Sequence, residues 1–281
     1  MRLVILGDFH YSSLEEMDTE KDKQIFDIRD KYYEKVIYSF LKTKGDYHIS
    51  LGDLTNYGNK QELEYVCSAM KNKGVNFIHV LGNHDSYNLS KNDILSITKQ
   101  ERYFSICEDN IIMIFIDSTL ETNHERWAGY MDEVQLQWLK NEIIHSTDKA
   151  ILIFSHHPVY GTTTFSKDEN LYIEQIEELN KILALHKGRG IFFCGHNHAN
   201  SICKRDNWYF VQTAATLDIN AFRVVDIYDD KIKLDYKEVE NVSELSKNLG
   251  SNMLHFSLKD NAVGNEEDRR LEILNDVLIS S

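Results

Sequence analysis

Hydrophobic residues along the chain gather in short runs that are separated by polar and turn-forming residues. Such runs, without alternation of apolar and polar positions, are typical of strands that are buried on both faces. The sequence therefore predicts buried strands at residues 2–6, 75–81, 111–116, 150–154 and 190–194, with a weaker candidate at 46–50.

Between these runs, apolar residues recur at the spacing of three and four that lines one face of a helix. The spacing predicts helices around residues 25–40, 63–70 and 134–143. Strands and helices therefore alternate through the first part of the chain, as they do in sheets that are covered by helices.

The pattern changes from residue 199 onward, where short strands follow one another. They include residues 208–213 and a hairpin of 222–228 with 231–239, which turns at Asp229-Asp230. This change suggests a second, more antiparallel sheet, and hence an α/β sandwich with helices outside.

Residues 1–240 are long enough to form one domain around one large core, and we expect residues 241–281 to form a partly helical C-terminal extension. Within the extension, Leu271, Leu274 and Leu278 line one face of a predicted terminal helix. This helix would dock on the domain or pair with another subunit.

The composition adds limits to this fold. Hydrophobic residues make up 42% of the 281 residues and charged residues 27%, which is typical of globular proteins and argues against disorder or a fibrous repeat. No apolar run approaches the ~18 residues of a membrane-spanning helix. The first predicted strand begins at Arg2, which leaves no room for a signal peptide. We therefore expect a cytoplasmic protein without a membrane partner.

The net charge of −14 opposes binding to duplex nucleic acid, because most of the surface would repel a polyphosphate backbone. An anionic substrate would need a local positive charge. Bound divalent ions can provide that charge.

Five polar blocks follow directly on predicted strands. The carboxyl ends of strands in open α/β sheets form the crevice in which ligands bind, so side chains that are distant in sequence can meet there. Side chains two residues apart in an extended segment point the same way, so Asp8 with His10, and His196 with His198, could each reach into one cavity. The blocks are Asp8-Phe9-His10, Gly52-Asp53, Gly82-Asn83-His84-Asp85, His156-His157-Pro158 and Gly195-His196-Asn197-His198.

The donor types in these blocks point to a metal centre. Carboxylate, amide and imidazole groups suit Mn, Fe, Co or Zn, and the lack of thiolates argues against a structural zinc site. Seven donors are too many for one tetrahedral ion, but they fit two ions that share a bridging carboxylate. The candidate ligands are Asp8, His10, Asp53, Asn83, His156, His196 and His198.

Isolated histidines have a simpler interpretation. A single histidine on an apolar strand is usually a buried core residue, and we interpret His48 and His79 in this way. We expect His124, His145, His186 and His255 at the surface.

Taken in order, the motifs D-x-H, GD, GNHD, HHP and GHNH resemble those of the calcineurin-like metallophosphoesterase family, over residues 1–238. The segments GDLTN, SHHP and FCGHNH are most similar to the bacterial glycerophosphodiesterase and class III cyclic-nucleotide phosphodiesterase branch. The resemblance implies a four-layer α/β/β/α sandwich, in which two mixed sheets are flanked by helices.

The resemblance also implies roles for individual residues. One metal ion would be held by Asp8, His10, Asp53 and His198, and the other by Asp53, Asn83, His156 and His196, with Asp53 bridging. A hydroxide between the ions would attack phosphorus. His84 would face the phosphate and donate a proton or stabilise charge, and Asp85 would orient His84.

Several residues beside the blocks are candidates for holding ligands in place or contacting substrate. For His157, support of the metal-binding loop is favoured over direct ligation. The other candidates could equally be packing or turn-forming residues, and they are Asn56, Tyr11, Asn197, Tyr57, Tyr87 and Tyr160.

No lysine or arginine lies within the blocks, although Arg126, Lys167 or Arg205 could approach from loops. A dianionic monoester usually requires more cationic groups than a diester does, so the sequence favours small diesters such as cyclic nucleotides or glycerophosphodiesters. The alternatives are a phosphomonoesterase or nucleotidase, a nuclease or nucleotide pyrophosphatase on the same site, and a non-catalytic protein-binding scaffold. The scaffold would normally lack some ligands or the phosphate-facing histidine.

Overall fold

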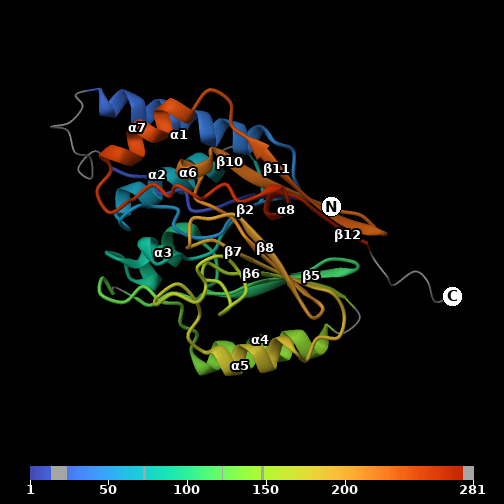
Figure 1. Ribbon diagram of the computed structural model, residues 1–281. Helices are drawn as coiled ribbons and strands as arrows, with labels where there is room; N and C mark the ends of the chain where they lie inside the picture. The colour runs from blue at the N-terminus through green and yellow to red at the C-terminus, as the bar shows by residue number, and fades with distance from the viewer. Residues whose placement is uncertain (14–23, 72–73, 122, 147–148, 275–281) are drawn as a thin grey trace.

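The computed structural model describes residues 1–13, 24–71, 74–121, 123–146 and 149–274. The strands of these residues form two mixed sheets of six strands each. The sheets stack face to face, with helices on both outer sides (Figure 1). The predicted four-layer α/β/β/α sandwich is confirmed.

The first sheet has the strand order β12-β11-β10-β1-β2-β3. Strands β1, β2 and β3 are parallel neighbours, whereas β10 pairs with β1 in the antiparallel direction. The strands are β1 (Arg2–Leu6), β2 (Tyr47–Ser50), β3 (Phe77–His79), β10 (Ala221–Ile227), β11 (Lys231–Glu238) and β12 (Leu271–Leu274).

The second sheet has the order β4-β5-β6-β7-β9-β8, with parallel pairing from β5 through β9 and antiparallel pairs at both edges. Its strands are β4 (Phe104–Cys107), β5 (Ile111–Phe115), β6 (Ala150–Phe154), β7 (Gly190–Cys194), β8 (Ser201–Arg205) and β9 (Trp208–Gln212).

Helices cover the outer face of each sheet (Figure 1). The first sheet packs against α1 (Ile25–Lys42), α2 (Lys60–Lys71), α3 (Lys91–Thr98) and α7 (Ser243–Asn252). The second sheet packs against α4 (Glu133–His145) and α5 (Ile176–Leu183). The short helical turns are η2 (His84–Ser86), α6 (Thr216–Ile219) and α8 (Glu266–Arg269).

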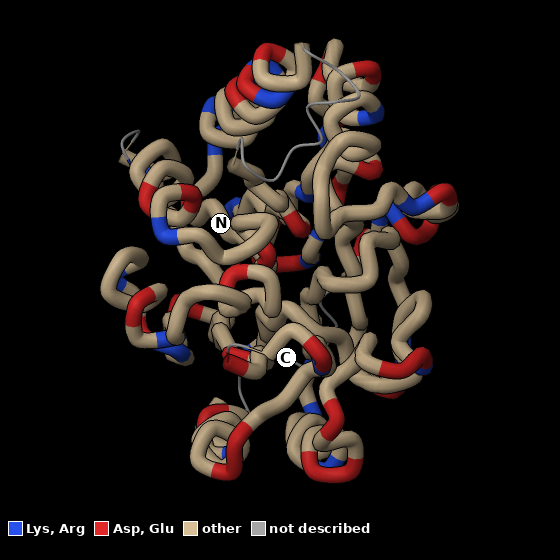
Figure 2. The backbone as a smooth tube through the Cα atoms, turned by 90° about the vertical axis from the view of Figure 1, so that its left-hand side faces the viewer, with Lys and Arg blue, Asp and Glu red and all other residues tan. Residues whose placement is uncertain are grey.

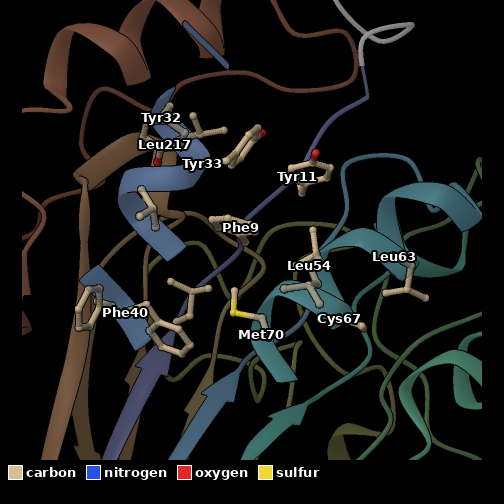
Figure 3. Close-up of a cluster of buried hydrophobic side chains, with 14 of the residues drawn as sticks. Phe9, Tyr11, Tyr32, Tyr33, Phe40, Leu54, Leu63, Cys67, Met70 and Leu217 are labelled. Carbon is tan, nitrogen blue, oxygen red and sulfur yellow. The ribbon is translucent and has the colours of Figure 1, made fainter. Parts of the chain in front are cut away.

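Each central strand contributes side chains to two core layers. In β1, Leu3 and Ile5 lie between the two sheets, whereas Val4 and Leu6 face the helices of the first sheet. Figure 3 shows part of that outer layer, in which Phe9 lies close to Tyr33. Because both faces are buried, the strands are hydrophobic runs without polar alternation.

The sequence pattern predicted that the strands after residue 199 form a second sheet of their own, and this prediction is wrong. They do not form a separate second sheet: β8 and β9 extend the sheet of β4–β7, and β10–β12 extend the sheet of β1–β3. Strand partners are chosen by contacts between distant segments, such as the pairing of Arg2 with Asp226, and hydrophobic periodicity does not report these contacts.

The prediction of a terminal helix is also wrong over the residues that the structure describes. Residues Leu271–Leu274 form β12, in which Ile273 pairs with Ile232 of β11 and is 2% exposed, whereas Leu274 is 62% exposed. The alternation of buried and exposed side chains is that of a strand. Leu278 lies outside the described residues.

The prediction that His186 lies at the surface is wrong. Its ring is buried beside Trp208, and its Nε2 lies 3.1 Å from the carbonyl oxygen of Arg189. His124, His145 and His255 are exposed as expected, and His48 and His79 are buried.

None of the helices in the described part of the chain combines the length and the apolar character needed to cross a bilayer. In the view of Figure 2, acidic and basic residues are interspersed over the outer helices and loops.

The assignment of β12 as a strand can be tested by two substitutions. We expect Ile273→Ala to lower the free energy of unfolding by about 2–4 kcal/mol, because it removes buried apolar volume. Leu274→Ala should change it by less than about 0.5 kcal/mol, because that side chain is exposed. Urea unfolding measures both values. A large loss for Leu274→Ala with a small loss for Ile273→Ala would contradict the strand.

Candidate metal centre

The five polar blocks lie at the carboxyl ends of β1, β2 and β3 in the first sheet and of β6 and β7 in the second. Two groups of donor atoms converge there, with all atoms of a group within 4.8 Å of one another. The first group comprises Asp8, His10, Asp53 and His198, and the second comprises His156, His157 and His196. All seven of these side chains are deeply enclosed by the protein.

In the first group, two imidazoles face each other. The Nε2 atoms of His10 and His198 are 2.9 Å apart, and Asp53 Oδ2 lies 3.8 Å from His10 Nε2. On the far side of the ring, His198 Nδ1 lies 3.3 Å from the Oδ2 atom of Asp218. A carboxylate in this position fixes the ring and leaves Nε2 free to bind a cation.

In the second group, the donors converge on His156 Nε2. Asn83 Oδ1 lies 2.9 Å away, His196 Nδ1 3.1 Å and Asp53 Oδ2 3.3 Å. Asn83 therefore belongs to this cluster. Its amide nitrogen donates to the Tyr87 hydroxyl at 2.8 Å, which directs the amide oxygen toward the cluster.

The outer ring nitrogens show which inner atoms carry lone pairs. His156 Nδ1 lies 2.8 Å from the Leu51 carbonyl oxygen, and His196 Nε2 lies 3.0 Å from that of Asn170. Because a carbonyl only accepts hydrogen bonds, these outer nitrogens carry protons, and in the neutral rings the inner nitrogens are acceptors. Acceptors at about 3 Å from one another in a buried site need a positive charge among them, which either a bound cation or a proton on His156 Nε2 supplies. These nitrogen and oxygen atoms are the kinds that bind metal ions, so the site fits a metal centre.

Asp53 lies between the two groups. Its Oδ2 atom faces both His10 and His156, and its Oδ1 atom accepts a 2.8 Å hydrogen bond from the backbone N–H of His84. Burial opposes the charged carboxylate, but the neighbouring His156 and His84 outweigh it and hold the pKa of Asp53 well below its usual value. The carboxylate is therefore charged at neutral pH, as a ligand shared by two cations requires.

Burial sets the protonation of the imidazoles. It lowers the pKa of His196 to about 3, with a further contribution from His156, and it lowers the pKa of His10 and His157 well below the usual value. These rings are neutral at pH 7, the form that binds a metal ion. His156 and His198 are the exceptions. In His156 burial is outweighed by Asp53 and Asp8, which raise its pKa to about 9, and in His198 burial is outweighed by Asp218 and Asp8, which raise the pKa of that ring.

The local backbone brings the ligands together in a way that the sequence pattern did not predict. His10, Asp53, His196 and His198 have φ angles of 49°, 47°, 68° and 52°. Their segments are therefore not extended, so the reason given for the pairing is wrong, although Asp8 and His10 do lie in one donor group and His196 and His198 line one cleft. Left-handed conformations cost a non-glycine residue on the order of 1 kcal/mol each, and such costs gather at functional sites.

Glycines allow the blocks to approach closely. A Cβ atom at Gly52, where φ is 101°, would lie 2.4 Å from His156 Nδ1. A Cβ atom at Gly82 would lie 2.0 Å from the backbone nitrogen of Asp53. Both positions require the absence of a side chain.

His84 lies at the edge of the centre, with its ring centroid 4.6 Å from that of His10. The sequence analysis expected Asp85 to orient this ring, but Asn56 contacts it instead. His84 Nδ1 lies 2.5 Å from the carbonyl oxygen of Asn56. Asp85 instead accepts hydrogen bonds from Thr55 and from the backbone of Gly82, and it faces buried His79 at 3.2 Å. Asp85 therefore shapes the loop, and Asn56 holds the ring.

The remaining candidates take different positions. Both ring nitrogens of His157 are engaged, with Ser118 Oγ and with the Trp127 carbonyl oxygen, each at 2.9 Å. Asn197 is buried and donates to Thr164, Leu171 and Gln212. Tyr11 lies in the core layer of Figure 3, where its hydroxyl accepts from Arg29. Tyr160 packs on Tyr172.

A cleft of about 420 Å³ opens over the donor groups. Tyr57 and Tyr87, which the sequence analysis named, line this cleft. Further lining residues lie in loops without a recognisable motif, and their sequence carries no signal that would have identified them: His124, Trp127, Leu171, His255, Phe256, Ser257 and Lys259. Asp218, which lies in α6 and contacts His198, was also missed, because it belongs to no recognisable motif.

The three cations that could have approached from loops do not line this cleft. Arg126 pairs with Glu174, and Arg205 donates to Asn180. Lys167 lies near Gly161.

Residues 1–200 match the family of calcineurin-like phosphoesterases. A probable glycerophosphodiester phosphodiesterase from Arcobacter nitrofigilis is 27% identical over 204 residues, which cover 70% of this chain and 72% of that protein. A probable cyclic nucleotide phosphodiesterase from Xenorhabdus bovienii is 23% identical over 267 residues, or 92% of this chain and 96% of that protein.

Among solved structures, a dimetal phosphatase from Danio rerio has the same fold. Its TM-score is 0.67 at 17% identity, and the match covers 85% of this chain and 96% of that one. The chain thus belongs to the calcineurin-like phosphoesterase family and is a metal-dependent phosphohydrolase. The family and the two donor groups together support a centre for two metal ions.

The close approach of His156 to Gly52 can be tested by substituting Gly52 and, as a control, Gly74, which also has a positive φ. Gly52→Ala should lower both the metal content and the unfolding temperature, because the new Cβ would displace His156. Gly74 has a φ of 68° and open space around it, so Gly74→Ala should cost only backbone strain, about 1 kcal/mol. Metal analysis and thermal unfolding compare the two. Equal metal content in both variants would contradict the role of Gly52.

Proposed function

We propose that this protein is a two-metal phosphodiesterase that hydrolyses small phosphate diesters. The observation that carries the proposal is the position of Asp53, whose Oδ2 atom faces donors of both groups. In this proposal Asp8, His10, Asp53 and His198 hold one ion. Asp53, Asn83, His156 and His196 hold the other.

When bound, the ions supply an activated water nucleophile and neutralise charge on the phosphate. The protein holds the ligands in place through groups behind them. The carbonyl oxygens of Leu51 and Asn170 fix His156 and His196, and Asp218 fixes His198. Such contacts select the tautomer and the ring orientation of each ligand.

In this proposal His84 acts on the leaving group. Its Nδ1 faces the Asn56 carbonyl oxygen, so Nε2 is the nitrogen available to the cleft that His84 lines. In the protonated ring, Nε2–H donates a proton to the leaving oxygen or stabilises its negative charge. A positioned general acid contributes typically ~10²- to 10⁴-fold in rate.

The charge of the cleft supports a diester. Among the described residues that line it, Lys259 is the one lysine or arginine. A diester carries one negative charge that two metal ions can largely offset, whereas a dianionic monoester usually needs additional cationic groups. Two relatives of similar sequence are named as phosphodiesterases, which agrees with this preference.

Hydrolysis of two generic esters tests the reaction class. Protein reconstituted with Mn²⁺ should have a higher kcat/KM for bis(p-nitrophenyl) phosphate than for p-nitrophenyl phosphate. The reverse order would favour a phosphomonoesterase. Turnover of neither ester by protein that has bound two metal equivalents would favour a non-catalytic scaffold.

Two substitutions should separate metal binding from proton transfer. Asp53→Asn should reduce binding at both metal sites together, because one carboxylate faces both donor groups. His84→Ala should retain both metal ions, while kcat falls by about 10²-fold or more. Metal analysis and steady-state kinetics measure the two effects. Two full metal equivalents in Asp53→Asn would refute the bridge, and near wild-type kcat in His84→Ala would remove the role of that ring.

A further inference from the structure

The segment between α7 and α8 reaches the metal centre from a part of the chain that lies beyond the family match. The ring of Phe256 lies 5.0 Å from the ring of His10 and 5.3 Å from that of His198, between centroids. The cleft over the donor groups is lined by His255, Phe256, Ser257 and Lys259. The C-terminal segment therefore supplies one wall of the cleft.

Both ends of this wall are attached to the metal centre. At one end, the Asn56 side chain donates to the Leu254 carbonyl oxygen at 2.8 Å, and the backbone oxygen of Asn56 contacts His84. At the other end, the backbone N–H of Lys259 donates to Asp218 Oδ1 at 2.8 Å. The other oxygen of Asp218 faces His198. The wall is thus held in a fixed position relative to the site of reaction.

The exposed part of the wall is aromatic. The ring of His255 stacks on Tyr57 with centroids 4.1 Å apart and an interplanar angle of 14°. His124 lies beside both Tyr57 and Tyr87, at 5.6 Å and 5.0 Å between centroids. Rings grouped at the rim of a cleft offer flat surfaces on which a planar group of a ligand can stack.

We propose that residues 255–259 select the substrate, and this inference rests on the proposed function. His255, supported by Tyr57, stacks on a planar ring carried by the diester, and the ammonium group of Lys259 attracts its phosphate. The preferred substrates are therefore small diesters with an aromatic ring, such as a nucleobase, over glycerophosphodiesters that lack one.

Binding of two phosphate compounds to the Mn²⁺-loaded protein tests the wall independently of turnover. The wild-type protein should bind adenosine monophosphate more tightly than glycerol 3-phosphate. His255→Ala should weaken binding of adenosine monophosphate about tenfold, because one stacking surface is lost. Its affinity for glycerol 3-phosphate should change less than twofold. His255→Phe, which keeps a ring, should restore most of the lost affinity.

Lys259→Gln should behave differently from His255→Ala. It removes a positive charge and should weaken binding of both compounds to a similar extent, about threefold for an exposed charge. Tyr38→Ala is the matched control, because Tyr38 is 62% exposed on α1 and does not line the cleft. It should change neither affinity.

Equal loss of both ligands in His255→Ala, or equal affinities in the wild type, would overturn ring selection. Unchanged binding in Lys259→Gln would overturn the role of the ammonium group. Turnover of cyclic adenosine monophosphate and of a glycerophosphodiester separates the two proposals. Selective binding without hydrolysis of either diester would refute the proposed function alone. Hydrolysis of both, in a ratio that His255→Ala leaves unchanged, would refute the selecting wall alone.

Discussion

The centre of this protein depends on one constraint, which is that several hydrogen-bond acceptors are buried against one another. The Asp53 carboxylate, the Asn83 amide oxygen and the inner nitrogens of His156 and His196 lie within about 3 Å of their neighbours. Their outer atoms are already engaged by backbone or side-chain groups, so rotation of the rings cannot relieve the arrangement. A positive charge among them, from a bound cation or from a proton on His156, satisfies such a set, since burial makes unpaired polar atoms costly. The chain therefore folds around a position for positive charge.

Much of the surrounding structure serves this arrangement. The parallel strands β1, β2 and β3 and the pair β6 and β7 end at the same edge, which delivers ligands from both sheets. Left-handed turns then direct the side chains inward, and glycines at 52 and 82 leave room for them. The strain of these turns is balanced by burial of the strands on both faces. A rigid sandwich thus holds a locally unfavourable backbone in place.

The rest of the cleft has a different origin. It comes from connecting loops and from residues 255–259, which carry no motif and lie beyond the family match. Residues 255–259 are held by the hydrogen bonds of Leu254 with Asn56 and of Lys259 with Asp218, and by packing of Phe256 and Leu258 against the core. The ligands come from the strand ends and the rest of the cleft comes from loops, so the two parts of the site lie on different segments of the chain.

The sequence by itself determined the family, the sandwich and the residues that converge, because buried strands and metal donors have strong local signatures. Asp8, Asp53 and His156 are identifiable since each follows an apolar strand. The tertiary structure decided which sheet β10 joins, that Leu271–Leu274 is a strand, and that Asn56 contacts the ring of His84. It also placed Asp218 and Lys259 at the site. These outcomes depend on pairing between distant segments, whose energies are set by packing in three dimensions and leave no period or spacing in the chain.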